Sequence, residues 1–171
     1  MFVLIIIQFI KVIMVGFGYD SHKLALGESL ILGGVIIESE KGTIAHSDGD
    51  VILHTLCDAL LGAAGLGDIG ELFPDSDEKY KNYDSSKFVI NVIELIEKAG
   101  FEPVNIDITV ILEKPKLKIY KEKIKNRIAE LCKIKPDRVN VKAKTNEGLG
   151  FVGREEGVAA YCICEIRKKS F

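Results

Sequence analysis

The residues best suited to chemistry in this 171-residue chain lie in one stretch, AHSDGDVILHTLCDALLGAAG, residues 45–65. The stretch carries two of the three histidines and three aspartates: His46, Asp48, Asp50, His54 and Asp58. Residues 42–78 contain no Lys or Arg. Burying a carboxylate without a partner costs several kcal/mol, so the compensating cation must come from elsewhere in the fold or be a metal ion.

A second acidic and histidine pair occurs in GYDSH, where Asp20 and His22 are two residues apart. In an extended strand the two side chains project from the same face. On a helix, Asp50, His54 and Asp58 recur at i, i+4 and i+8 along one stripe. We predict that Asp20, His22 and His54 bind one metal ion and leave a fourth position open, as in catalytic zinc sites. Asp50 or Asp58 would then orient His54.

Each of these side chains also has an ordinary structural interpretation. A D-x-H pair in a turn is rarely a metal site, a helix histidine is more often a core residue, and His46 alone would serve as a cap. The metal-site interpretation is favoured because all three histidines lie beside aspartates, in a region with no basic side chain to neutralise them.

Length and composition limit the class of protein. A chain of 171 residues is long enough to bury its own core, so we expect one domain over residues 1–171. The hydrophobic fraction of 47% and the charged fraction of 28% are typical of a globular protein. A formal net charge of −2 argues against binding along a nucleic-acid backbone.

The four cysteines show no disulfide or metal-site spacing, so we expect reduced, buried thiols in a cytoplasmic protein. Residues 1–13 form an apolar N-terminal extension. It lacks a preceding basic region and a cleavage pattern, and it is shorter than the roughly 20 residues that span a bilayer. We therefore predict no membrane partner, and interpret the extension as an extra strand or as residues upstream of a usual start at Met14.

The periodicity predicts strands interleaved with helices. Strands are expected over 12–18, 104–112, 138–145 and 158–167, a hairpin over 28–39, helices over 48–64, 85–100 and 116–132, a loop over 68–84 and a glycine-rich connection over 146–157. Ser47 or Asp48 should cap the first helix and Gly65 should end it. This order predicts an α/β fold, an α+β sandwich with one mixed β-sheet and helices packed on one face.

Three motifs resemble a known family: GYDSHKL, the long stretch at 45–77, and VKAKTNEGLGFVGREEG. In this order, from about residue 14 to the C-terminus, they are similar to the 2-C-methyl-D-erythritol 2,4-cyclodiphosphate synthases of non-mevalonate isoprenoid biosynthesis. The resemblance implies a phosphorus-oxygen lyase. It would convert 4-diphosphocytidyl-2-C-methyl-D-erythritol 2-phosphate into the cyclic diphosphate and CMP. It also implies a ring-like homotrimer with active sites shared between subunits.

The resemblance further implies roles for individual residues. Zn²⁺ would lie on Asp20, His22 and His54, and Mg²⁺ or Mn²⁺ on Glu147, with His46 and Thr145 as the catalytic residues on the reacting phosphates. The implied substrate contacts are Asp20, His22, His46, Ser47, Asp68, Ile69, Gly70, Phe73, Asp75, Asp77, Leu112, Lys116, Leu117, Ala143, Thr145, Glu147, Phe151 and Arg154. Among these, Leu112, Lys116, Leu117 and Ala143 would form the cytosine pocket.

The chain departs from the family pattern ahead of Met14 and at Lys144 and Asn146, where hydroxyl residues are frequent. Two other functions remain open. A zinc-dependent phosphohydrolase would use the same three ligands with a bound water as nucleophile. A non-catalytic nucleotide- or metal-binding module would need only the pocket. In GLGFVGREEG, the apolar residues and Arg154 would line a three-fold axis of the trimer, although an ordinary buried loop would explain them equally well.

Overall fold

A five-stranded mixed sheet forms the centre of the computed structural model, which describes residues 12–74, 77–80 and 83–169. The strand order is β4 (Lys41–Ile44), β1 (Ile13–Leu26), β7 (Gly157–Lys168), β5 (Phe101–Ile111) and β6 (Val139–Lys144). Of the strand pairs described in this sheet, only β5 and β6 are parallel. A separate hairpin joins β2 (Leu30–Leu32) to β3 (Val35–Ile37) through Gly33 and Gly34, as predicted.

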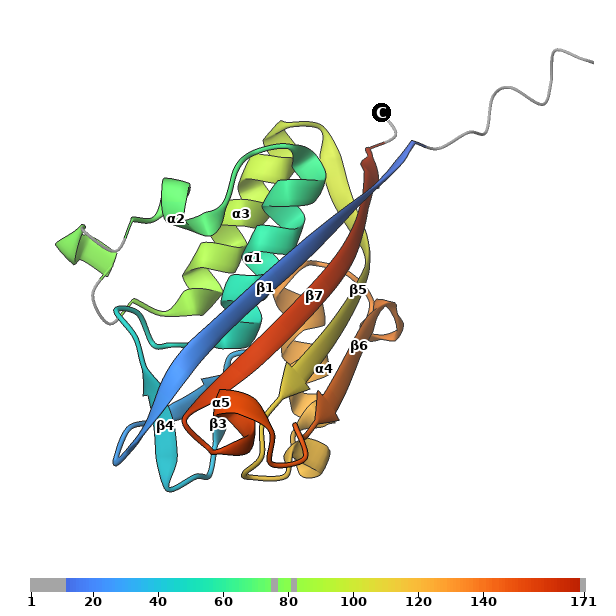
Figure 1. The fold of residues 1–171 in the computed structure, drawn as a ribbon. Helices are drawn as coiled ribbons and strands as arrows, with labels where there is room; N and C mark the ends of the chain where they lie inside the picture. The colour runs from blue at the N-terminus through green and yellow to red at the C-terminus, as the bar shows by residue number, and fades with distance from the viewer. Residues whose placement is uncertain (1–11, 75–76, 81–82, 170–171) are drawn as a thin grey trace, which may run out of the picture.

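Three helices cover one face of this sheet: α1 (Val51–Ala64), α3 (Ser85–Lys98) and α4 (Lys121–Leu131). Figure 1 shows them behind β1, β7 and β5. The remaining helical segments are short: α2 (Ile69–Leu72), η2 (Glu78–Tyr80), η3 (Leu117–Ile119), η4 (Pro136–Arg138) and α5 (Gly150–Gly153). The predicted fold class, one mixed sheet with helices on one face, is confirmed.

Two glycines let α1 lie directly on β1. A Cβ atom at Gly16 would lie 1.8 Å from the carbonyl oxygen of Ala59, and one at Gly18 would lie 2.1 Å from that of Thr55. Both distances are far below van der Waals contact, so only glycine fits. Side chains alternate along a strand, and Asp20 and His22 therefore project from β1 on the same side as these glycines, toward α1.

The start of α1 corrects one prediction. The N-cap is Asp50, not Ser47 or Asp48, because Gly49 has a positive φ of 71° and the helix begins only at Val51. The fully buried Asp50 carboxylate accepts four backbone N–H groups, two from the first turn of α1 and two from the hairpin turn: Ile52, Leu53, Gly33 and Gly34. Burial raises the pKa of Asp50 to about 6, although the N–H groups of Gly34, Gly33 and Leu53 oppose the shift.

Asp50→Ala should therefore destabilise the protein strongly. The change removes a helix cap and leaves two glycine N–H groups of the hairpin without an acceptor, at a combined cost of about 3–5 kcal/mol. Asp84→Ala is the matched control, because Asp84 caps α3 through a single bond to the Ser86 N–H. Urea unfolding should show about 1 kcal/mol for Asp84→Ala, and equal losses for the two variants would contradict this account.

Other element boundaries differ from the prediction. β1 continues through GYDSHKL to Leu26, because β1 pairs with β7 without a break from Ile13 to Lys23. The predicted loop 68–84 contains α2 and η2. The predicted helix 116–132 is divided into η3 and α4, since the Tyr120 N–H bonds the Leu117 carbonyl in a 3₁₀ turn before the α-helix begins. Gly65 ends α1 in the left-handed conformation, as predicted.

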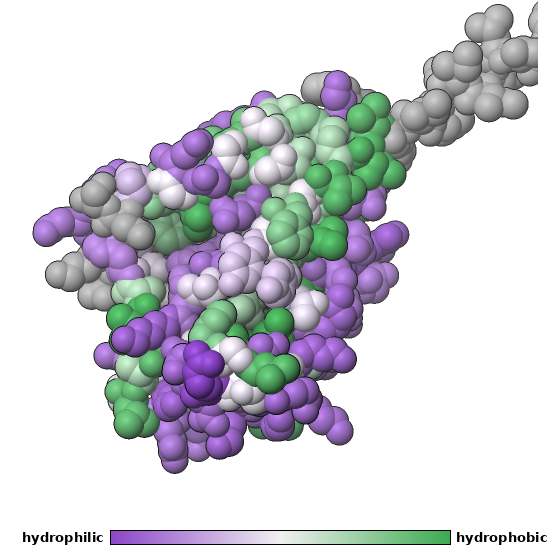
Figure 2. Space-filling model, viewed as in Figure 1, coloured by the Kyte–Doolittle hydropathy of each residue, from purple (hydrophilic) through white to green (hydrophobic). Residues whose placement is uncertain are grey.

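The face of the sheet opposite the helices is open. Alternate residues of β1 and β7 point outward there, and Val15, Phe17 and Ile163 are 66%, 62% and 50% exposed. Figure 2 views the molecule from this side, and hydrophobic residues gather near the end of the sheet where β1 begins and β7 ends. Such an apolar patch is typical of an interaction surface.

The cysteines lie on the covered side of β7, in α1 and directly after α4. Cys57, Cys132, Cys162 and Cys164 are all buried and free. Burial raises the pKa of the Cys132 thiol well above its usual range and that of Cys164 to about 12. Among the described residues, no helix combines the length and apolar character needed to cross a membrane.

Candidate functional site

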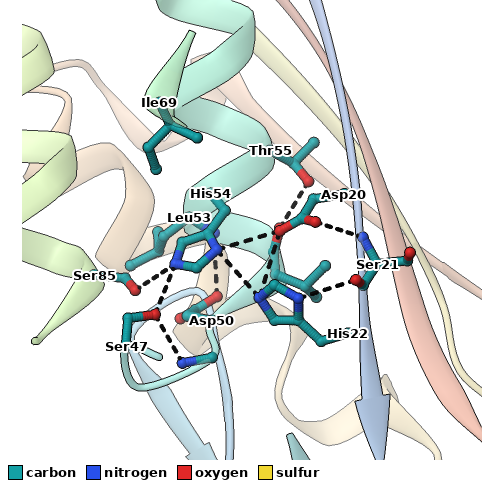
Figure 3. A network of polar contacts seen from close by, with 12 residues as sticks. Asp20, Ser21, His22, Ser47, Asp50, Leu53, His54, Thr55, Ile69 and Ser85 are labelled. Atoms are coloured by element: carbon teal, nitrogen blue, oxygen red, sulfur yellow. Dashed lines mark hydrogen bonds and ion pairs between the residues drawn. The ribbon is translucent and has the colours of Figure 1, made fainter. Parts of the chain in front are cut away.

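The three predicted metal ligands meet where β1 faces α1 (Figure 3). His22 Nε2 lies 3.1 Å from His54 Nδ1, and Asp20 Oδ2 lies 3.2 Å from His54 Nδ1 and 3.4 Å from His22 Nε2. They form one group of potential metal-binding side chains in the described part of the chain. The glycines beneath α1 set this spacing, because they bring the helix residue onto the strand.

The protonation of His22 indicates what the group binds. His22 Nδ1 lies 3.0 Å from the Ser21 carbonyl oxygen. A carbonyl only accepts hydrogen bonds, so Nδ1 carries the proton and the lone pair of Nε2 faces His54 and Asp20. A carboxylate oxygen and an imidazole lone pair therefore point at the same small volume, where a metal ion or a proton on His54 would stabilise both.

The pKa shifts agree with a cation at this point. Burial opposes the charged form of His54, but the hydrogen bond that the charged ring donates to Asp20 and the charges of Asp20, Asp50 and Asp48 raise its pKa above the usual value. Burial likewise opposes the charge of Asp20, yet the two histidines hold its pKa below the usual value. The edges of a tetrahedron around zinc measure about 3.3–3.6 Å with such ligands. The observed separations are close to this range, so the three side chains fit a metal ion.

The ligands line a cavity of about 360 Å³, which we call the metal cavity. Its lining is Asp20, His22, Ile44, Ala45, His46, Ser47, His54, Asp58, Ile69, Gly70, Phe73, Tyr80 and Phe88. His46 Nε2 is buried and has no hydrogen-bond partner within the described ranges. A buried ring nitrogen without a protein partner is available to a polar group of a ligand.

A second cavity, of about 280 Å³, lies at the start of α4 and the end of β6, and we call it the lysine cavity. It is lined by Leu112, Lys116, Leu117, Lys118, Lys121, Ala143, Lys144 and Thr145. None of its four ammonium groups has a hydrogen-bond or ion-pair partner among the residues that the structure describes. Four cations around one cavity favour an anionic ligand such as a nucleotide.

The structure thus separates the predicted residues into two groups. The metal cavity is lined by the predicted residues Asp20, His22, His46, Ser47, His54, Ile69, Gly70 and Phe73. The lysine cavity is lined by Thr145 and by the predicted cytosine pocket, Leu112, Lys116, Leu117 and Ala143, and the two linings share no residue. Their roles remain predictions.

Several predicted residues line neither cavity. Asp68 caps α2 by accepting the Glu71 N–H, and Asp77 forms an ion pair with Lys79. Glu147 has a positive φ of 52° and accepts the Thr145 hydroxyl at 2.8 Å. Asp75 lies outside the described residues.

The predicted three-fold segment is likewise away from both cavities. Leu149 is 70% exposed and Phe151 41% exposed, whereas Val152 is buried. Arg154 makes two hydrogen bonds to the Glu156 carboxylate, at 3.0 and 2.9 Å. The two exposed apolar residues show that this is not simply a buried loop, and its place in a trimer stays a prediction.

The prediction that Asp50 or Asp58 orients His54 is wrong. Asp50 caps α1, and Asp58 accepts the Ile69 N–H at 2.9 Å, which ties α2 to α1. His54 Nε2 instead contacts the hydroxyls of Ser47 and Ser85. Sequence analysis missed Ser85, because it lies 31 residues from His54 and resembles an ordinary residue of a helix start.

Comparison with known proteins decides the family. A family model described as the YgbB family matches residues 13–167. The chain belongs to the YgbB family. A YgbB relative from Salinibacter ruber, named 2-C-methyl-D-erythritol 2,4-cyclodiphosphate synthase, is 51% identical over 153 residues, which are 90% of this chain and 98% of that protein.

Solved structures of similar proteins have the same fold as this YgbB chain. The bifunctional IspDF from Campylobacter jejuni superposes with a TM-score of 0.90 at 44% identity, over 94% of this chain and 43% of that one. The IspF of Plasmodium falciparum, solved as a CDP complex, superposes with a TM-score of 0.82 at 34% identity, over 92% of this chain and 97% of that one.

Proposed function

We propose that this chain catalyses the reaction for which its relatives are named, the formation of 2-C-methyl-D-erythritol 2,4-cyclodiphosphate. Its substrate would be 4-diphosphocytidyl-2-C-methyl-D-erythritol 2-phosphate. The observation that carries the proposal is that half of the residues are identical over nearly the whole length of a synthase. The Asp20, His22 and His54 group and the two cavities supply the chemistry that such a substrate needs.

In this reaction an oxygen of the 2-phosphate bonds to the β-phosphorus. The bond from the β-phosphorus to the oxygen bridging it to the α-phosphate breaks, and CMP leaves with that oxygen. The attacking phosphate is already ionised near neutral pH, so no general base is required. His46 Nε2, which lacks a partner within the described residues, would donate a hydrogen bond to a reacting phosphate, and the Thr145 hydroxyl would hold another.

The main barrier is the approach of two anions, which repel by roughly 4 kcal/mol for unit charges about 4 Å apart at an effective dielectric of 20. Asp20, His22 and His54 would hold Zn²⁺, and Glu147 would hold Mg²⁺ or Mn²⁺. Divalent cations supply charge screening and polarisation of the phosphoryl group when bound. Phe73, Tyr80 and Phe88 pack against one another at the metal cavity and would limit access of water to the reacting phosphates.

The separation of the two cavities supports a site assembled from two subunits of a homotrimer. The substrate carries its methylerythritol phosphate and its cytidine at opposite ends. In a ring, the metal cavity of one subunit would lie beside the lysine cavity of its neighbour. The open, apolar face of β1 and β7 would supply contact surface between subunits.

Incubation of the protein with the cytidyl substrate, zinc and magnesium tests the proposal. We expect cyclic diphosphate and CMP in equal amounts, measured by phosphorus NMR and nucleotide chromatography. Glu147→Gln should retain zinc yet lose most of the turnover, since it removes only the second cation site. CMP release with an open-chain 2,4-bisphosphate would indicate a phosphohydrolase, and metal binding without turnover would indicate a binding module. Either result would overturn the proposal.

A further inference from the structure

A partly buried hydrogen-bond chain begins at Ser85 behind His54, on the side away from the other two ligands (Figure 3). Ser85, the first residue of α3, has no exposed surface, and its hydroxyl lies 2.9 Å from His54 Nε2. The same hydroxyl makes a very short hydrogen bond to Asp48 Oδ1. The second carboxylate oxygen of Asp48 accepts the Ser85 N–H at 3.0 Å.

The direction of these bonds follows from counting protons. A serine hydroxyl has one proton, and the Asp48 carboxylate can only accept it. Ser85 Oγ must therefore accept from His54, which places the proton of neutral His54 on Nε2. The lone pair of His54 is then on Nδ1, the atom that faces Asp20 and His22.

Ser47 does not determine by itself which ring nitrogen of His54 carries the proton. Its hydroxyl oxygen accepts the Gly49 N–H at 3.2 Å and lies 3.1 Å from His54 Nε2. Its own proton is not committed to a carboxylate, so Ser47 can either donate to His54 or accept from it. Only the Asp48 and Ser85 pair has a fixed direction.

We propose that Asp48 and Ser85 are positioning residues that hold His54 in the tautomer required for metal binding. Asp48 acts on His54 only through the Ser85 hydroxyl. This inference rests on the proposed zinc site, but it concerns residues for which the family resemblance implied no role. Partners behind a metal-binding histidine typically account for 10- to 100-fold in metal affinity.

Two variants and one control test the proposal in the full-length chain. Asp48→Ala frees the Ser85 proton to turn toward His54, and Ser85→Ala removes the acceptor. Ser86→Ala is the control, because Ser86 is also buried in the first turn of α3, but among the described contacts its hydroxyl bonds neither His54 nor Asp48. Zinc affinity would be measured by chelator competition. The His54 tautomer would be measured by ¹⁵N NMR of the zinc-free chain at alkaline pH, where the ring is neutral.

We expect both variants to lose 10- to 100-fold in zinc affinity, and the wild-type ring to carry its proton on Nε2. In Asp48→Ala the proton should shift toward Nδ1, while Ser86→Ala should match the wild type in both measurements. Lower unfolding free energy in Asp48→Ala and Ser85→Ala with unchanged zinc affinity and tautomer would show a merely structural role and overturn the inference. An Nδ1–H tautomer in the wild type would also overturn it. Failure of the proposed function appears separately, as zinc-loaded wild type without cyclic product.

Discussion

His54→Ala should yield a folded protein that binds no zinc tightly and forms no detectable cyclic product. The substitution removes one of three protein ligands, and the two that remain are not enough to bind zinc tightly. Loss of the metal removes several kcal/mol of charge stabilisation in the transition state, which is roughly 10³-fold or more in rate. Elemental analysis of the purified variant and a product assay measure the two effects.

His46→Ala is the matched control, because it deletes another histidine of the same cavity that is not among the three ligands. It should keep about one zinc per chain while losing turnover. Full zinc occupancy in both His22→Ala and His54→Ala would refute the assignment of the ligands.

Zinc affinity of the wild type should fall with decreasing pH, since the raised pKa of His54 means that protons compete with the metal.

Mixed trimers should recover activity from two inactive parents. One parent is His54→Ala, with a defective metal cavity, and the other is the Lys116→Ala, Thr145→Ala double variant, with a defective lysine cavity. After dissociation and reassembly in equal amounts, about a quarter of the subunit boundaries should combine two intact halves. Activity near a quarter of the wild-type value is therefore expected in the product assay, against almost none in either parent.

The control is the same mixture without dissociation, which should stay inactive. Native mass spectrometry must show trimers that contain both parents. If such mixed trimers are present and no mixing ratio restores activity, each site is contained within one chain and the shared-site model is wrong.

The parts of the fold that could be predicted depend on local signals. The helix at 85–98 follows from its apolar spacing and the Asp84 cap, and the hairpin follows from Gly33 and Gly34. The metal group could be predicted because strand and helix periodicity place Asp20, His22 and His54 on single faces. The start of α1 could not, because the choice of Asp50 as its cap depends on bonds to a hairpin 16 and 17 residues away.

The contacts between His54 and the surrounding hydroxyl groups could not be predicted from local sequence patterns either. Ser85 reaches His54 only because α3 packs beside α1, and nothing in DSSKF distinguishes this serine from a helix-start residue. Likewise, the sequence could not show that the implied substrate contacts line two cavities rather than one. That division depends on the positions of η3 and β6 relative to α1, which the complete sheet order determines.

The two glycines beneath α1 suggest a better way to recognise such sites in unfamiliar sequences. Gly16 and Gly18 contribute no ligand atom, yet any side chain there would lift α1 and carry His54 away from β1. The residues at alternate positions of this strand, Gly16, Gly18, Asp20 and His22, together form one sequence motif, G-x-G-x-D-x-H. A search with this seven-residue signature, followed by a histidine on the next helix, should discriminate better than D-x-H alone, because it encodes the spacing of the backbone together with the ligands.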